Sequence, residues 1–325
     1  MKYRLLGKTG FKVSEIGFGA GSIGGSAYGK QSEMDSFEAL NISIDNGLNF
    51  IDTAQVYGNG KSEQIIGKVL KERKERIYVS TKIPPIPGTW PPSPYDKSED
   101  RFPEKYIKEN VNDRCKMLGV DCLDILLLHT WTRAWNKNPK PLILLDKLRK
   151  EGKIKFIGIS TAEQDQNGAI ELMENGLIDV AEVIFNIFEQ EPVAELLPAA
   201  KKFNVGILGR VPLDEGSLTG KYTKETTFGE GELRNTYFRG EKLTLTLERV
   251  EKIKEEIKDT NLSIIQVAIK FILAQQAIST VIPGIRNARQ AKENTAISDL
   301  PPLSKELIEK LQKHYWLHNL GRYTW

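Results

Sequence analysis

Four polar side chains that can move or orient a proton stand where buried strands are expected to end. Asp52 ends the apolar run LNFIDTA, Tyr57 follows in the next turn, Lys82 lies in IYVSTKI, and His129 ends CLDILLLH. A tyrosine has a pKa of about 10, which a nearby lysine ammonium would lower, and Asp52 would keep that lysine charged. With His129 orienting a carbonyl, the set suits proton donation by Tyr57 to a carbonyl oxygen. Because no side chain supplies a hydride, a reduction would also need a nicotinamide cofactor.

Each of these side chains also has an ordinary structural explanation. Asp52 could cap the next helix, Lys82 could extend to solvent, and His129 or Tyr57 could simply pack at the end of a sheet. Their positions on consecutive units favour one shared site if the fold is a barrel, where successive strands are neighbours. A Schiff-base lyase with Lys82 as nucleophile is a further alternative, but Asp52 would hold Lys82 charged and that nucleophile must be neutral.

The elements that would position these residues alternate regularly along the chain. Short apolar runs rich in β-branched residues are separated by helical patterns. The expected strands are residues 15–19, 48–54, 77–83, 122–129, 154–160, 180–186, 205–211 and 279–284. Runs that are apolar on both faces are typical of parallel strands covered by helices. Eight such units favour an α/β fold with one (β/α)8 TIM barrel over an open doubly wound sheet, and residues 1–325 are expected to form a single domain.

Several segments are expected in addition to the eight units. KYRLLGKTGFKVS predicts an N-terminal β-hairpin that could close the barrel floor, and Ser62 and Pro103 are expected at helix starts. The long connections 84–102 and 212–242 both follow strands, so both should rise from the C-terminal rim, where barrel enzymes hold their active sites. An extra helix is expected near 245–257. The aromatic tail HYWLHNLGRYTW could line the pocket or contact another subunit.

The composition favours a small-molecule ligand over nucleic acid or membrane as the partner. The 325 residues carry 46 Lys and Arg against 43 Asp and Glu, mixed along the chain, for a net charge of +3. Cys115 and Cys122 form no CxxC motif, so two reduced thiols and no metal site are expected. There is no signal-peptide pattern and no apolar segment near the roughly 20 residues that span a bilayer. The sequence predicts a cytoplasmic protein that could form an oligomer.

Six segments, in order along the chain, resemble the aldo-keto reductase superfamily. They are FIDTAQVYGNGKSEQIIGKVL, VSTKI, DILLLH, IGIST, VPLDEGSLTGKY and VIPGIRNARQAKEN. The similarity covers essentially the whole chain. It implies a barrel enzyme that uses NADPH to reduce an aldehyde or ketone, in which Asp52, Tyr57, Lys82 and His129 match the catalytic tetrad with Tyr57 as the general acid. An alternative on the same fold is an NADP(H)-binding sensor or channel-type subunit with little turnover.

The resemblance also implies where NADPH/NADP+ would lie. The chain has Thr161 and Glu182 where the family commonly has Asn and Gln for the carboxamide; a glutamate donates only when protonated, and Asn186 could compensate. Arg210 stands where the family usually stacks an aromatic ring. The residues expected to bind the cofactor are Gly19, Ala20, Gly21, Ser160, Thr161, Glu182, Arg210, Val211, Pro212, Leu213, Gly216, Leu218, Lys221, Pro283, Gly284, Ile285, Arg286, Gln290, Glu293 and Asn294.

The choice between NADPH and NADH depends on the last of these segments. By resemblance, Gly284, Arg286 and Gln290 lie around the 2′-phosphate at the start of a helix, with Glu293 and Asn294 near the adenine. Arg286 is the reason to expect NADPH. For the carbonyl substrate, Trp90, Trp131 and Trp316 are expected to line an apolar pocket.

One motif points to a different fold. Gly19, Gly21 and Gly24 spell GxGxxG after a strand, the fingerprint of a Rossmann dinucleotide site. That fold needs an acid about 20 residues on, at the end of the second strand. Asp45 has that distance but lies in a helical pattern, and Asp52 ends a strand but lies too far along. In the family that the sequence resembles, this turn lies beside the nicotinamide and the substrate, so the resemblance implies that the glycines permit close approach there.

Overall fold

The structure is a computed structural model that describes residues 1–25 and 27–317. Eight parallel strands pair in chain order from β3 to β10, and seven of the eight expected runs contain the observed strand, while β10 begins one residue before its run. Parallel bridges join Ile16 to Val281 and Gly19 to Gly284, so the first and last strands meet and the (β/α)8 barrel is confirmed. The strands are β3 (Phe18–Gly19), β4 (Phe50–Asp52), β5 (Tyr78–Ile83), β6 (Leu123–Leu128), β7 (Ile154–Ser160), β8 (Val180–Ile184), β9 (Gly206–Arg210) and β10 (Ile278–Val281).

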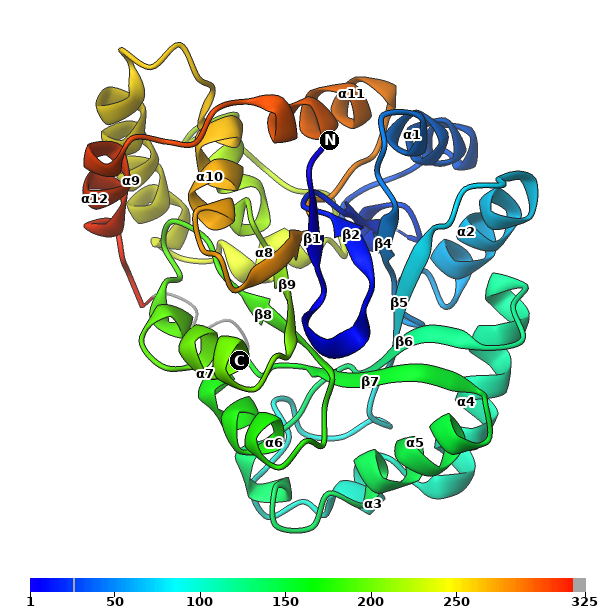
Figure 1. Cartoon of the computed structure of the whole chain (residues 1–325). Coiled ribbons are helices and arrows are strands. Elements are labelled where there is room, and N and C mark those ends of the chain that lie inside the picture. Colours follow the sequence, from blue (N-terminus) through cyan, green and yellow to red (C-terminus); the bar gives the residue numbers. More distant parts are fainter. Residues whose placement is uncertain (26, 318–325) are drawn as a thin grey trace.

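Helices surround the barrel and bury its outer face (Figure 1). The strands are apolar on both sides because one face meets these helices and the other fills the barrel interior. The helices that alternate with the strands are α1 (Glu33–Asp45), α2 (Lys61–Glu72), α4 (Glu104–Leu118), α5 (Lys140–Lys150), α6 (Ile170–Glu174), α7 (Leu196–Lys202), α10 (Ile264–Leu273) and α11 (Ala288–Ala296). The additional helices are α3 (Ser98–Arg101), α8 (Leu233–Tyr237), α9 (Lys242–Ile257) and α12 (Lys305–Gln312).

The expected N-terminal hairpin is present and closes one end of the barrel. Strands β1 (Tyr3–Leu5) and β2 (Lys12–Ser14) pair antiparallel and lie across the barrel in Figure 1. Leu6 and Val13 are fully buried and pack with the barrel-interior side chains, among them Phe50. This apolar plug leaves the C-terminal ends of the strands as the open end.

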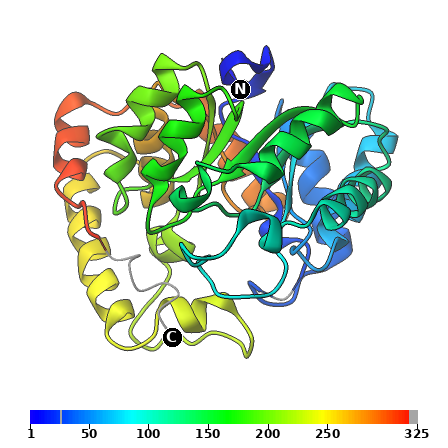
Figure 2. The same cartoon turned by 90° about the horizontal axis from the view of Figure 1, so that it is seen from below.

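The long connections lie at the end opposite the hairpin (Figure 2). Residues 84–102, which include α3, follow β5, and the segment after β9 contains α8 and the start of α9. The extra helix expected near 245–257 is α9. The aromatic tail is described only to residue 317, so most of that expectation lies outside the described residues. Within the described part of the chain, no helix is long and apolar enough to cross a membrane.

Helix starts were predicted less well than strands. Pro103 is the N-cap of α4, close to the expected position, but the Ser62 cap is wrong. Gly60, with φ of 87°, precedes α2, which begins at Lys61. Ser62 is instead the second residue of α2, and its hydroxyl is buried. The hydroxyl accepts a hydrogen bond from Thr53 and donates one to the Ala20 carbonyl, so it links the turn after β4 to the turn after β3.

Candidate active site

Lys82 lies at the centre of a buried polar cluster at the C-terminal ends of the strands. Its Nζ donates to Asp52 Oδ2 at 2.5 Å, to the Thr53 carbonyl at 3.1 Å and to Tyr57 Oη at 3.5 Å. The Lys82 side chain is fully buried, and Asp52 also accepts from Ser80 at 2.6 Å. The predicted convergence of Asp52, Tyr57 and Lys82 is therefore observed, because β4 and β5 are paired neighbours.

The charges in this cluster keep Lys82 protonated. Burial alone lowers the pKa of a lysine, but the carboxylates of Asp52 and Glu182, with Tyr57, outweigh burial and raise the pKa of Lys82. Lys82 is also absent from the cavity wall. A lysine that stays charged and lies behind the wall cannot act as a Schiff-base nucleophile, which argues against the lyase alternative.

Tyr57 departs from the expected acidity. Burial raises its pKa to about 12, the Lys82 charge lowers it, and Asp52 and Glu182 raise it again. The expectation that Lys82 makes Tyr57 a stronger acid than free tyrosine is therefore wrong in its net direction. Sequence spacing predicted the lysine but not the depth at which the phenol lies, and here burial is the larger effect.

His129 faces the Tyr57 ring across the site. The two ring centroids are 6.0 Å apart and nearly perpendicular. Burial, with the charges of Lys82 and Arg210, holds the pKa of His129 well below its usual value of 6.5. His129 is thus neutral, with one N–H that can donate and one nitrogen that can accept.

Glu182 on β8 places a second carboxylate beside the same lysine. Glu182 Oε2 lies 3.2 Å from Lys82 Nζ, and the side chain is almost completely buried. Burial raises the pKa of Glu182 to about 7, against the opposing charge of Lys82. Lys82 therefore has two carboxylate neighbours, where the spacing of the sequence motifs predicted one.

These side chains open into a cavity of about 590 Å³ at the C-terminal rim. Its wall includes Asp52, Tyr57 and His129 at one end and Arg286 and Asn294 at the other. A cavity of this size and mixed character is typical of a small-molecule or cofactor site. Among the described residues, no group of three or more His, Cys, Asp or Glu side chains could hold a metal ion.

Most of the predicted cofactor residues line this cavity. They are Gly19, Gly21, Ser160, Thr161, Glu182, Arg210, Val211, Pro212, Leu213, Gly216, Lys221, Gly284, Arg286, Gln290, Glu293 and Asn294. Ala20, Leu218, Pro283 and Ile285 are buried and absent from the wall. The side chains of Ala20, Leu218 and Ile285 pack in the hydrophobic core instead.

Of the three tryptophans expected to line the substrate pocket, one lies on the cavity wall and two do not. Trp90 lines the cavity. Trp131 packs against Trp135 and donates to Asn136, and Trp316 packs against Phe188, so neither borders the cavity. Their contribution is to packing, and the substrate expectation for these two is not supported.

The loop after β9 holds a strained backbone along the cavity. Val211, Asp214 and Glu215 have φ between 46° and 54°, a region that non-glycine residues seldom occupy, and a β-branched valine least of all. A Cβ on Gly216 would lie 2.3 Å from Tyr222 Oη, so this position requires glycine. Such strain commonly marks a ligand-binding loop.

The GxGxxG glycines pack against the Tyr57 turn and the barrel seam. A Cβ on Gly19 would lie 2.6 Å from the Ile282 carbonyl, and one on Gly24 would lie 2.1 Å from the Tyr57 carbonyl. At Gly21 the nearest atoms are those of the Tyr57 ring, at 3.5 Å. The glycines thus permit close approach beside Tyr57, and the barrel topology excludes the Rossmann alternative.

Comparison with known sequences decides the family. The sequence description of the "Aldo/keto reductase family" matches residues 15–315. The chain belongs to the aldo/keto reductase family. An NADH-specific methylglyoxal reductase from Escherichia coli is 27% identical over 336 residues, covering 96% of this chain and 100% of the relative. A probable voltage-gated potassium channel subunit beta from Oryza sativa is 28% identical over 328 residues, covering 96% of each chain.

Solved structures agree with this assignment. An aldo-keto reductase from Bacillus halodurans, in its holo form, has a TM-score of 0.76 and 25% identity, covering 97% of this chain and 96% of the other. This aldo/keto reductase is therefore an oxidoreductase of a family that binds a nicotinamide cofactor.

The carboxamide region of this aldo/keto reductase differs from the pattern that the resemblance predicts. The Thr161 hydroxyl turns away from the cavity toward Gln166 and the Glu182 carbonyl. Asn186 donates one N–H to the Val211 carbonyl and accepts from the Phe188 and Glu189 amides. Its side chain is fully buried and is absent from the cavity wall, so the structure does not support the expectation that Asn186 compensates for Glu182.

Arg210 of the aldo/keto reductase is held in place by its neighbours. Its Nη2 donates to the Thr161 carbonyl and to Glu163 Oε1, both at 3.0 Å. These contacts fix the guanidinium at the cavity wall, at the position where the resemblance predicts a stacking group.

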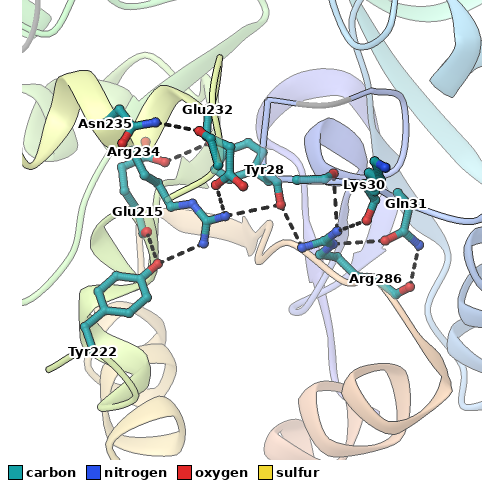
Figure 3. Close-up of polar contacts among 11 residues, drawn as sticks. Tyr28, Lys30, Gln31, Glu215, Tyr222, Glu232, Arg234, Asn235 and Arg286 are labelled. Carbon is teal, nitrogen blue, oxygen red and sulfur yellow. Dashed lines mark hydrogen bonds and ion pairs between the residues drawn. The ribbon is translucent and has the colours of Figure 1, made fainter. Parts of the chain in front are cut away.

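Arg286 binds a strap of backbone, defined as residues 27–31, that the sequence did not single out. Its guanidinium donates to Gln31 Oε1 at 2.9 Å and to the carbonyls of Tyr28, Gly29 and Lys30 (Figure 3). Arg234 from α8 donates to the same Tyr28 carbonyl at 3.3 Å. The strap therefore joins the loop before α11 to the loop after β9.

The Tyr28 side chain extends the same bridge. Its hydroxyl donates to Glu215 Oε2 at 2.8 Å, and Tyr222 donates to the Glu215 carbonyl at 2.9 Å. Tyr28, Glu215, Tyr222 and Arg234 all line the cavity. The sequence did not single them out because Tyr28, Glu215 and Tyr222 lie in irregular connections and Arg234 lies on the five-residue helix α8, which is too short to show a periodic pattern.

Proposed function

We propose that this aldo/keto reductase reduces an aldehyde or ketone to the alcohol with NADPH, and that Tyr57 is the general acid. The observation that carries the proposal is the buried contact of Lys82 with both Asp52 and Tyr57, with a neutral His129 on the same cavity. A protonated phenol beside a fixed cation and a hydrogen-bond donor is what proton delivery to a carbonyl oxygen requires.

Each of the four residues has its own part in the proposed proton transfer. His129 donates its N–H to the carbonyl oxygen and orients the substrate. Tyr57 gives its proton to that oxygen while a hydride forms the new C–H bond, and the charge left on the phenolate is met by the Lys82 ammonium. Asp52 keeps Lys82 charged and in place. A bound nicotinamide supplies the hydride.

The cavity fits a dinucleotide in shape and in the chemistry of its wall. It runs from Tyr57 past the strained loop after β9 to α11, and Gly216 and Gly284 allow backbone to be approached closely. Ser160, Thr161, Glu182 and Arg210 would hold the nicotinamide end, and Gln290, Glu293 and Asn294 the adenosine end. These assignments follow the family resemblance and the positions of the side chains on the wall.

The preference for NADPH depends on Arg286, whose donors are already engaged. A guanidinium has five N–H groups, and those of Arg286 form four hydrogen bonds to the strap. We propose that Arg286 contributes charge and at most one further hydrogen bond to a 2′-phosphate. The preference for NADPH over NADH is then about tenfold or less, since a bidentate contact is not available.

The test is NADPH oxidation with a panel of aldehydes and ketones, by the wild type and by Tyr57→Phe. The variant keeps the ring and loses the proton, so kcat/KM should fall by about 10² to 10⁴. Its thermal midpoint should stay close to that of the wild type, because the hydrogen bond of the Tyr57 hydroxyl to a described residue is the long 3.5 Å contact with Lys82. No turnover with any carbonyl, or equal activity of the two proteins, would reject the proposal.

A sensor or channel-type subunit on the same fold remains the alternative, since one relative carries such a name. It makes a different prediction. Cofactor would bind tightly, turnover would be negligible for every carbonyl, and a stable partner protein would co-purify with the chain.

A further inference from the structure

Glu182 stands out because it places a second carboxylate on the lysine that serves Tyr57. It is the central residue of β8, in register with Ser160 on β7 and Leu208 on β9, and is 2% exposed. Its buried Oε2 lies 3.2 Å from Lys82 Nζ and forms an ion pair with it. The proton-transfer steps above leave Glu182 without a role.

The donors of Lys82 are limited. An ammonium has three N–H groups. Two are directed to Asp52 Oδ2 at 2.5 Å and to the Thr53 carbonyl at 3.1 Å. The third has two acceptors within reach, Tyr57 Oη at 3.5 Å and Glu182 Oε2 at 3.2 Å. A carboxylate is the stronger acceptor, so the charge on Glu182 decides how much of the ammonium the phenol receives.

We propose that Glu182 is a positioning residue that competes with Tyr57 for Lys82, so that loss of the Glu182 charge strengthens the support that Lys82 gives the phenol. The inference rests on the proposed function, because it assigns Glu182 a role through the general acid of that reaction. It adds to that function a control on the acidity of Tyr57 by a residue outside the predicted tetrad.

Electrostatics around Glu182 place this control near neutral pH. Lys82 from β5 and Arg210 from β9 favour the charged form, Asp52 from β4 opposes it, and Tyr57 and His129 are neutral neighbours. Burial is the largest effect and raises the pKa of Glu182 to about 7. The charged form in turn raises the pKa of Tyr57. Reduction should therefore weaken as the pH rises through about 7.

The direct test records the carbon-13 NMR resonance of Tyr57 in protein labelled at the tyrosine Cζ atom. The resonance is assigned by its loss in Tyr57→Phe. In the wild type this resonance should shift in a titration with a midpoint near pH 7, because the hydrogen bond from Lys82 weakens as Glu182 ionises. In Glu182→Gln, which has the same shape and no charge, the shift should be absent. A wild-type resonance that stays constant through neutral pH overturns the inference even if the variant fails to fold.

The matched control is Asp179→Asn. Asp179 is a buried acid directly before the first residue of β8, three residues before Glu182 along the chain. It contacts Arg149 and Lys8 and not Lys82. The Tyr57 titration in this variant should match that of the wild type. A titration lost in both variants would mean that any change of charge on β8 disturbs the site, and would overturn the specific role of Glu182.

Kinetics separate this inference from the proposed function. The kcat/KM of the wild type for carbonyl reduction should fall as the pH rises through about 7. The kcat/KM of Glu182→Gln should show no such fall, so the ratio of the variant to the wild type should rise over this range. If Tyr57→Phe loses turnover but Glu182→Gln follows the wild-type pH profile, the inference fails and the proposed function stands. If Tyr57→Phe equals the wild type, the proposed function fails, and the role of Glu182 in it fails as well.

Discussion

The two ends of the barrel hold buried carboxylates in opposite ways. At the hairpin end, Asp179 has two cations, Arg149 at 3.0 Å and Lys8 at 3.3 Å, and also accepts from a backbone amide. Asp124, at the same end, pairs with Arg76 and Lys155 and accepts from the Val79 amide. At the open end the ratio of cations to carboxylates is inverted, since Asp52 and Glu182 share the single ammonium of Lys82.

The difference separates stability from function within one fold. Surplus cations and aromatic packing, such as Phe11 on Tyr78 with centroids 4.2 Å apart, fix the hairpin end. At the open end, burial outweighs the charges of Lys82 and Arg210 and raises the pKa of Glu182 to about 7. Tyr57 there shares its hydrogen-bond donor, Lys82, with two carboxylates. Perturbed groups of this kind are concentrated where chemistry occurs, which supports the proposal that the open end holds the active site.

Removing the shared lysine should have the largest effect on stability. Lys82→Met leaves Asp52 and Glu182 buried without their cation, which typically costs about 3 to 5 kcal/mol of unfolding free energy. Near pH 5 the cost should be smaller, because Glu182 is then protonated and one carboxylate fewer is left unpaired. Urea denaturation at pH 5 and pH 8 measures both values.

The matched change at the other end is Lys8→Met. Asp179 would keep Arg149 and its backbone donor, and Lys8 is one-third exposed, so the loss should be about 1 kcal/mol or less. Equal losses at the two ends would contradict the comparison.

Glu182→Gln should change how stability depends on pH. The pKa of Glu182 is about 7 in the folded protein and ordinarily 4.5, so the folded state holds the extra proton between these values. Wild-type stability should fall as the pH rises from about 4.5 to 7, by up to about 3 kcal/mol from this group. The variant lacks that fall. Its unfolding free energy relative to that of the wild type should therefore increase over this pH range and stay constant above it. Unfolding midpoints collected across that pH range would show no such divergence if Glu182 titrates normally.

Arg286→Met should give the smallest effect. Loss of the strap contacts should weaken NADPH and NADH alike, and loss of the charge should lower the NADPH to NADH affinity ratio by a further tenfold or less. Titrations of both cofactors by fluorescence give the ratio. A hundredfold or larger drop confined to NADPH would show that Arg286 reads the 2′-phosphate directly, against the engaged donors described here.

Residues on regular elements were predictable, since period and order determine where they lie. Apolar runs in alternation identified the barrel strands, and with them the meeting of Asp52, Lys82 and His129 on one rim. Side chains in the loops were not predictable, because nothing local distinguishes Leu218, which is buried away from the cavity, from Leu213, which lines it.

Properties that depend on how deeply a side chain is buried could not be predicted from the sequence either. The sign of the Tyr57 pKa shift follows from burial by parts of the chain distant in sequence. The approach of Glu182 to Lys82 follows from the curvature of the sheet, which brings β8 toward β5 across the barrel interior. Trp131 and Trp316 show the same limit, since an aromatic residue near a rim can pack inward as readily as line a pocket.

The central claim is that the open end of this barrel directs a hydride to a carbonyl carbon while Tyr57 protonates the oxygen. The most direct measurement is transfer of deuterium from NADPH labelled at the hydride position to the product of any aldehyde or ketone that is turned over. The account predicts label on the carbinol carbon in the wild type and about 10² to 10⁴ less labelled product per unit time in Tyr57→Phe. An alcohol product without the label, or equal labelling by both proteins, would contradict it.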